Sequence, residues 1–203
     1  MNNADIRKLI VKILFALLSG WLLFLVGLAG VYTRQLTHPA CPPDALEHPG
    51  YTLVQVSVSP KLALPGWWRA PQNGAVILLL GGSGSNAASI LPTADLLAQE
   101  GYGILTLASR NCAGQPVTLG YREAEDVQAM LTFARSQPGV DWVGALGFSA
   151  GGAAVLRAAA REPGLQAVIA EGQYSNLRHE VINDPARPLS LQWQFHRAVL
   201  FTL

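Results

Sequence analysis

The sequence predicts an α/β fold with a doubly wound, mostly parallel sheet. Three observations support this prediction. Short apolar runs alternate with helix-forming segments, which is the order that buries a parallel sheet between layers of helices. The run at 75–80 is apolar at every position, as expected of a strand covered on both faces. The run at 142–146 leads through Gly-Phe-Ser-Ala-Gly at 147–151 into an alanine-rich, helix-forming stretch.

The individual elements follow from local composition. β-Branched residues predict the first strand, and Pro65 restricts the second to an edge or a bent strand. Thr118 can cap the long second helix, which is expected to end before Pro138-Gly139. In chain order we expect strands at 52–58, 62–68, 75–80, 104–107, 142–146 and 165–170, with helices at 90–99, 118–136 and 152–161.

The composition indicates a single domain with contact to lipid. The chain has 203 residues, of which 50% are hydrophobic and only 13% are charged. Such a balance is too apolar for an ordinary soluble protein. The net charge is +1, and the basic residues are scattered without interleaved aromatic residues, so we expect no nucleic-acid partner.

The N-terminal region predicts a transmembrane anchor. Arg7, Lys8 and Lys12 precede an uncharged apolar stretch at 13–32 that is long enough to cross a bilayer as a helix. A cleaved signal peptide is the alternative, because residues 27–29 (Gly-Leu-Ala) could be a cleavage site, but the apolar stretch is longer than usual for one. The positive-inside rule places residues 1–12 in the cytoplasm and the rest of the chain outside it.

A proline-rich segment separates the anchor from the domain. Residues 33–50 show no hydrophobic periodicity and are interpreted as a linker, and residues 51–203 as the domain. His38 and His48 lie in this segment and are interpreted as polar residues without a catalytic role.

The two cysteines, Cys41 and Cys112, lie far apart in the sequence and lack C-x-x-C spacing. They therefore indicate neither a zinc site nor a redox pair. A disulfide in an oxidising compartment and two free thiols both remain open.

The Gly-Phe-Ser-Ala-Gly motif predicts a serine nucleophile at Ser149. A serine on a sharp turn between a buried strand and a helix has a strained backbone, and Gly147 and Gly151 would let the strand and the helix approach closely. The turn would expose the hydroxyl and leave the amide of Ala150 directed at a developing oxyanion.

A glycine-rich turn at 81–86 follows the apolar run at 75–80. It is not a phosphate-binding Walker A loop, because no Gly-Lys-Ser/Thr follows, and a dinucleotide fingerprint would need glycine where Ala87 stands. We favour an oxyanion loop in which the amide of Ser83 is the second donor beside Ala150. Two amides held in place before the oxyanion forms stabilise the transition state of acyl transfer strongly.

An acidic cluster begins the second helix. Glu123, Glu125 and Asp126 lie where the helix dipole favours negative charge, so we interpret them as capping and solvated surface residues rather than as a metal site.

These features together resemble the α/β-hydrolase superfamily, in particular membrane-anchored bacterial proteins of the serine aminopeptidase-like and dienelactone-hydrolase-like group. The resemblance covers about residues 52–181. It implies an α/β-hydrolase fold with Ser149 as nucleophile and the amides of Ser83 and Ala150 as oxyanion hole. The matching motifs are LLGGSGSN at 79–86, GYG at 101–103, LGYREAEDV at 119–127, LGFSAGG at 146–152 and AVIAE at 167–171.

The chain departs from the resemblance at two places. Relatives carry His-Gly where this chain has Gly81-Gly82. They also place the catalytic acid and histidine after later strands, so we expect a domain that is incomplete at its C-terminus. Candidates for the base are His196 and His179, with His196 preferred. Candidates for the acid are Glu171, Glu180 and Asp184. Glu171 is preferred because it ends a strand that is expected to lie next to the strand leading into Ser149.

The predicted function is hydrolysis of an ester, thioester or peptide bond through an acyl-enzyme, with no metal or cofactor. The expected partners are a small ester or peptide substrate and the lipid bilayer around residues 13–32. A membrane-tethered, hydrolase-like binding protein without turnover is the alternative. A nucleotide-binding module that uses the loop at 81–86 is a third hypothesis.

Overall fold

The computed structural model describes residues 2–44 and 47–176. The chain divides into two compact units. One contains Met1–Leu36, and the other is Thr37–Glu180.

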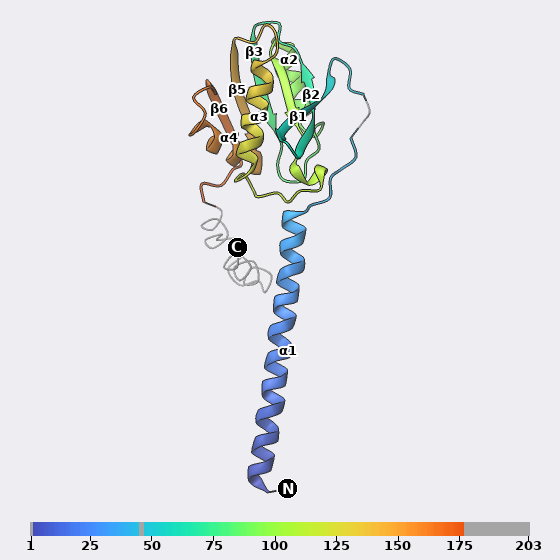
Figure 1. Ribbon diagram of the computed structural model, residues 1–203, viewed down its shortest axis with the longest axis vertical. Helices are drawn as coiled ribbons and strands as arrows, with labels where there is room; N and C mark the ends of the chain where they lie inside the picture. Colours follow the sequence, from blue (N-terminus) through green and yellow to red (C-terminus); the bar gives the residue numbers. More distant parts are fainter. Residues whose placement is uncertain (1, 45–46, 177–203) are drawn as a thin grey trace. The chain divides into compact units, whose positions relative to one another are not determined.

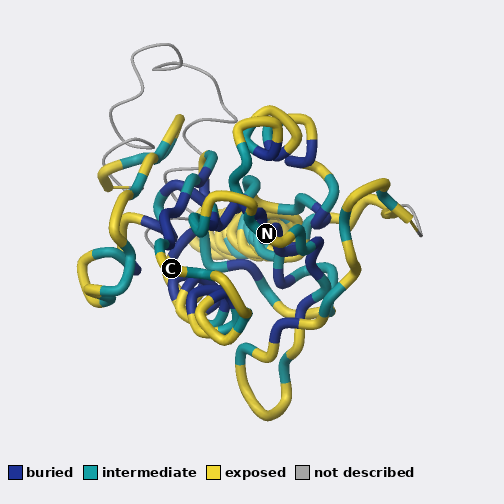
Figure 2. Tube along the Cα trace, turned by 90° about the horizontal axis from the view of Figure 1, so that it is seen from above, coloured by how far each residue is buried: buried dark blue, intermediate teal, exposed yellow. Residues whose placement is uncertain are grey.

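The first unit contains helix α1, Asn3–Thr37. Figure 1 shows it as one long helix, and Figure 2 shows no buried stretch along it. None of its 35 residues is buried, and its most apolar window has a mean hydropathy of 2.5. By length and composition alone, the helix could cross a membrane. It extends beyond the predicted span of 13–32 at both ends.

The second unit is built on a six-stranded sheet among the described residues, in the order β1-β2-β4-β3-β5-β6 (Figure 1). Strands β4, β3, β5 and β6 are parallel to one another, whereas β2 pairs antiparallel with both β1 and β4. The predicted α/β class with a mostly parallel sheet is confirmed. The strands are β1 Thr52–Ser59, β2 Leu62–Arg69, β3 Ala75–Leu80, β4 Gly103–Leu107, β5 Trp142–Phe148 and β6 Ala167–Glu171.

Helices cover both faces of the sheet. Helix α2, Leu91–Gln99, packs on one face, and helices α3, Glu123–Arg135, and α4, Ala150–Ala159, pack on the other. Leu78 belongs to the core under α3 and α4, while Leu79 belongs to the core under α2, and neither is exposed. Successive side chains of a strand point to opposite faces, which explains why β3 is apolar at every position.

Strand β2 is an inner strand, so an edge position for it is wrong. It lies between β1 and β4, but β4 pairs only with Trp68 and Arg69 at its end. Pro65 lies before this paired stretch. Proline has no backbone N–H to donate, but no hydrogen bond to β4 is formed at this position, so none is lost. Its carbonyl still accepts a hydrogen bond from the amide of Ala108, at 2.9 Å.

Cys41 and Cys112 form a disulfide across 71 positions of sequence. Of the two alternatives that the sequence left open, the structure therefore has the bonded one. The bond joins the segment before β1 to a short 3-10 helix, η1, Arg110–Ala113, which follows β4. The segment predicted as a linker is thus attached to the α/β unit.

Candidate active site

Ser149 lies on the turn between β5 and α4. It is exposed and has φ +52°, ψ −118°, and among the described residues only Leu119 is another non-glycine residue with positive φ. The amide of Ser149 donates a 2.8 Å hydrogen bond to the carbonyl of Glu171, which ends β6. A residue held in this sparsely populated backbone region by neighbouring strands indicates a functional position.

The two glycines of the motif permit this turn because each touches backbone. A Cβ on Gly147 would overlap the carbonyl of Gly151. A Cβ on Gly151 would lie 2.5 Å from the carbonyl oxygen of Gly81 and 2.6 Å from that of Leu80. Gly151 therefore sets the distance between the start of α4 and the loop that follows β3.

That loop passes beside Ser149. A Cβ on Gly82 would be 3.4 Å from Ser149 Cβ and 3.9 Å from Ser149 Oγ. In the described part of the chain, no protein atom accepts a hydrogen bond from the amide of Ser83 or of Ala150. The structure thus brings the turn and the glycine-rich loop together and leaves both predicted donor amides available.

The position of this site in the fold favours ligand binding. Strands β3 and β5 are parallel neighbours, with Leu80 opposite Gly147 at their carboxyl ends. The helix after β3 covers one face of the sheet and the helix after β5 covers the other. Such a switch point opens a crevice at the carboxyl ends of the strands, which is where open α/β sheets bind ligands.

The predicted base and acid are only partly described. Glu171 is paired with Phe148 and is exposed beside the turn. His179, Glu180, Asp184 and His196 lie outside the described residues. The described histidines contact other groups: His38 hydrogen-bonds Thr37, and His48 contacts Asp44 and Trp67.

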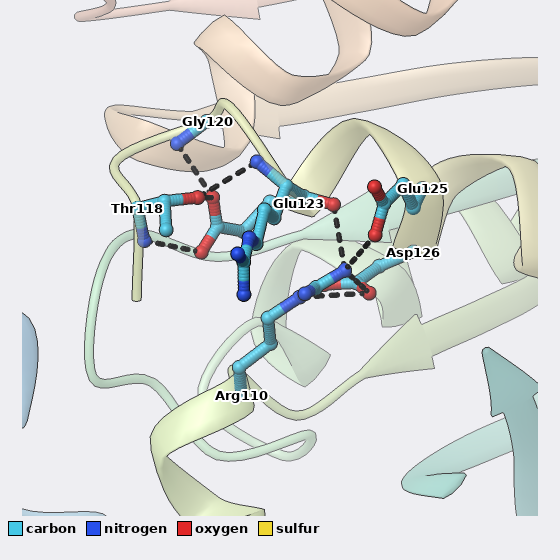
Figure 3. A network of polar contacts seen from close by, with 7 residues as sticks. Arg110, Thr118, Gly120, Glu123, Glu125 and Asp126 are labelled. Atoms are coloured by element: carbon cyan, nitrogen blue, oxygen red, sulfur yellow. Dashed lines mark hydrogen bonds and ion pairs between the residues drawn. The ribbon is translucent and has the colours of Figure 1, made fainter. Parts of the chain in front are cut away.

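Sequence reasoning missed a buried ion pair behind the site (Figure 3). Arg110, in η1, is 5% exposed and Asp126, in α3, is 3% exposed. The Arg110 guanidinium donates to both carboxylate oxygens of Asp126 at 2.8 to 3.1 Å and also to Glu125 at 3.0 Å. Its third partner is the carbonyl of Arg122, at 2.7 Å. An isolated arginine before Cys112 carries no sequence signal that reveals its burial.

Glu123 organises the turn before α3. Its carboxylate accepts hydrogen bonds from the amides of Thr118 and Gly120, at 2.7 and 2.8 Å, and from the Thr118 hydroxyl, at 2.7 Å (Figure 3). These contacts hold residues 118–122 as a turn, and the helix begins at Glu123 rather than at 118. Glu123 and Asp126 are buried, so their interpretation as solvated surface residues is wrong.

A small cavity connects these carboxylates to the site. It has a volume of about 30 Å³, enough for roughly one water molecule. Gly82 and Ala150 line it on the side of the proposed oxyanion hole, and Glu123 and Asp126 line it from α3. Asp126 of the ion pair and Gly82 of the glycine-rich loop therefore border the same cavity.

Burial raises the pKa of Asp126 to about 6, which the Arg110 ion pair opposes but does not cancel. This folded-state pKa exceeds the value of about 4 for an aspartate in an unfolded chain. Asp126 therefore contributes stability that is present below about pH 4 and is lost as the pH rises through about 6.

We accordingly expect the stability of the wild type relative to Asp126→Asn to fall between about pH 4 and pH 7. Urea unfolding of both proteins at several pH values measures this difference. A difference that rises with pH would show that the ion pair with Arg110 outweighs the desolvation of the carboxylate.

A family model described as X-Pro dipeptidyl-peptidase (S15 family) matches residues 33–194, which is more than half of the chain. The chain belongs to this family. A search of curated proteins found no match.

Solved structures share the fold. An esterase from Pyrococcus furiosus has a TM-score of 0.60 and 19% identity, covering 77% of this chain and 66% of that one. A dienelactone hydrolase from Anabaena variabilis has a TM-score of 0.54 and 27% identity, covering 63% and 65%. An acylaminoacyl peptidase from Pyrococcus horikoshii has a TM-score of 0.50 and 19% identity, covering 68% and 25%.

These similarities confirm the α/β-hydrolase fold that the resemblance implied. This chain spans slightly less than two thirds of the length of the esterase and of the dienelactone hydrolase.

Proposed function

We propose that this S15-family chain is a serine hydrolase in which Ser149 is the nucleophile. The observation that carries the proposal is the strained, exposed Ser149 on a strand-to-helix turn, with two available amides beside it in the described part of the chain. In this mechanism Ser149 Oγ attacks the acyl carbon and transfers its proton to a base. The amides of Ser83 and Ala150 stabilise the oxyanion, the leaving group departs with a proton, and water hydrolyses the acyl-enzyme.

The base and the acid complete the proposal. His196 is the preferred base and His179 the alternative, because a serine hydroxyl is a poor nucleophile until an imidazole takes its proton. Glu171 is the proposed acid, since its backbone is already bound to the amide of Ser149. A carboxylate in this role would orient the imidazole and stabilise its charged form.

The substrate class is an ester, a thioester or a peptide bond of a small molecule. The family model and the Pyrococcus horikoshii structure are named for peptidases, and the Pyrococcus furiosus structure for an esterase. All three bond types react through the same acyl-enzyme, so the names support the reaction class and leave the acyl group open. No metal or cofactor takes part in this mechanism.

We further propose that α1 is a membrane anchor with residues 1–12 in the cytoplasm, and that the α/β unit faces an extracytoplasmic compartment. The basic residues Arg7, Lys8 and Lys12 support this orientation. The disulfide between Cys41 and Cys112 supports it independently, because such bonds persist in oxidising compartments.

A non-catalytic binding protein on the same anchor is the second candidate. It is favoured by one observation: in the described part of the chain, no histidine contacts Ser149. Such a protein would bind a ligand over the site without turnover.

Covalent labelling with a fluorophosphonate distinguishes the two. The full chain in detergent is expected to be labelled at Ser149, and Ser149→Ala is expected to abolish labelling. Ser59→Ala, which removes an exposed serine at the end of β1, is the matched control and should label like the wild type. Folded wild-type protein that does not label would favour the binding protein.

A further inference from the structure

The segment that follows α1 contacts the glycine-rich loop. We call residues 37–44, which begin at the last residue of α1, the N-terminal strap and residues 82–86 the oxyanion loop. Pro39 of the strap packs on Gly84, where a Cβ would lie 3.1 Å from the proline ring. The side-chain amide of Asn86 donates a 2.8 Å hydrogen bond to the carbonyl of Pro43. Thus both the middle and the end of the loop are covered by the strap.

The strap is itself attached at several points. The amide of Val117 donates to the carbonyl of Thr37 at 2.8 Å, and the Asn111 side chain donates to the carbonyl of Pro39 at 2.9 Å. The indole of Trp67 donates to Asp44 at 3.1 Å. The disulfide from Cys41 to Cys112 is the covalent attachment, and it lies between the two contacts with the oxyanion loop.

The residues at the start of η1 also contact the loop. The amide of Ser109, which precedes η1, donates to the carbonyl of Ser85 at 3.0 Å. Asn111 and Cys112, which bind the strap, belong to the same short helix. The oxyanion loop therefore contacts both the strap and the residue that precedes η1, and the disulfide joins the strap to η1.

The other contacts of the loop are local, and one of them is the hydrogen bond that the Ser89 hydroxyl donates to Asn86 Oδ1 at 2.6 Å. The Ser85 hydroxyl donates to the carbonyl of Gly82 at 2.7 Å, within the loop itself. Gly84 has φ +83° and contributes no side chain. An oxyanion donor is effective only when its position is fixed before the charge develops. The amide of Ser83, between Gly82 and Gly84, depends for this on contacts made by its neighbours.

We propose that the N-terminal strap, fastened by the Cys41–Cys112 disulfide, is a positioning element for the oxyanion loop. A thiol reductant that cleaves this disulfide releases the strap and thereby slows the acylation of Ser149. The catalytic part rests on the proposed function of Ser149 and Ser83. Two thiols reduce the disulfide to two cysteine thiols and are themselves oxidised to one disulfide. Cys41 is exposed and Cys112 half-buried, so a small thiol can reach the bond.

The test uses the full chain in detergent, with the paired variant Cys41→Ser/Cys112→Ser and, separately, wild type reduced with dithiothreitol. Asn86→Ala removes the hydrogen bond to Pro43, together with the one that Asn86 accepts from Ser89, and leaves the disulfide in place. Leu131→Ala, a core change in α3, is the control for general loss of stability. Two quantities are measured well below the Tm: the rate of fluorophosphonate labelling, and hydrogen exchange at the amides of Ser85 and Ser109.

Labelling of the paired variant and of reduced wild type is expected to slow by about 10- to 100-fold. This is less than the effect of removing one oxyanion donor altogether, because the amide of Ser83 is displaced and not lost. Exchange at Ser85 and Ser109 should rise at least about tenfold, while amides of β3 and α3 keep their protection. Asn86→Ala should produce the same pattern more weakly. Leu131→Ala should change neither loop exchange nor labelling while the protein remains folded.

A double-mutant cycle tests whether the strap acts through the amide of Ser83. Ser83→Pro removes that donor, and Ser83 is not among the described residues with positive φ, which proline cannot adopt. In the Ser83→Pro protein, the added Cys41→Ser/Cys112→Ser substitutions should slow labelling much less than they do in the wild type. An equal slowing in both backgrounds would overturn the positioning role.

The outcomes separate the two proposals. Unchanged loop exchange in the paired variant overturns the strap proposal, whether or not the wild type labels. Wild-type labelling with unchanged rates in the paired variant also overturns it. If loop exchange rises but wild type does not label, the strap holds the loop and the nucleophile assignment alone fails.

Discussion

Replacing Gly151 by alanine is expected to reduce labelling at Ser149 by at least about 100-fold, the effect of a displacement of about 1 Å at a reacting site. The new methyl group would lie 2.5 Å from the carbonyl oxygen of Gly81 and 2.6 Å from that of Leu80. Both obstacles are backbone, so α4 or β3 must move. Either movement separates the amide of Ala150 from the oxyanion loop. Overpacking of this kind also destabilises by about 1–3 kcal/mol.

Gly164→Ala is the matched control. The three heavy atoms nearest to its methyl group would all belong to the guanidinium of Arg135, the flexible end of a long side chain that can move aside while its hydrogen bond to the Gly164 carbonyl adjusts. Labelling and thermal unfolding are measured on both variants. If Gly151→Ala labels at the wild-type rate, the close approach of α4 to β3 does not position the site.

Replacing Arg110 by methionine is expected to destabilise the α/β unit by about 3–5 kcal/mol. Removing one partner of a buried ion pair leaves the other charge desolvated without compensation, and Asp126 is only 3% exposed. Loss of the carboxylate's partner also raises the pKa of Asp126 further, so part of the cost is relieved when it takes up a proton. The measurement is the free energy of unfolding in urea at pH 7.

Two comparisons make this prediction specific. Arg161→Met removes an exposed arginine and should change stability little. Arg110→Met combined with Asp126→Leu removes both charges and should recover much of the loss, because apolar replacements of buried ion pairs are often neutral. A double variant as unstable as Arg110→Met would show that Arg110 acts mainly through its bond to the carbonyl of Arg122.

Much of the fold could be predicted because its signals are local. The uniform apolarity of β3 and the shift to alanine-rich sequence after Ser149 each reflect the periodicity of one element. Pro65 misled where it indicated an edge, because a strand order depends on which neighbours pair and how far along they do so. The residues of one strand do not by themselves determine which strands it pairs with or in which register.

The candidate site divides in the same way. The spacing of Gly147, Ser149 and Gly151 is local, and it predicted the turn. Burial of Arg110 with Asp126 could not be predicted, since a charged residue on a helix is ordinarily solvated. Those two residues are 16 positions apart and meet only because η1 and α3 pack together.

The sequence by itself determined the class of fold, the turn at Ser149, the glycine-rich loop and a helix apolar enough to span a membrane. Each depends on side-chain types at fixed short spacing, which act through backbone conformation and hydrophobic periodicity. Only the tertiary structure decided that Cys41 meets Cys112 and that the strap lies on the oxyanion loop. Such contacts join residues far apart in the chain, and they form because packing of the whole unit brings their surfaces together.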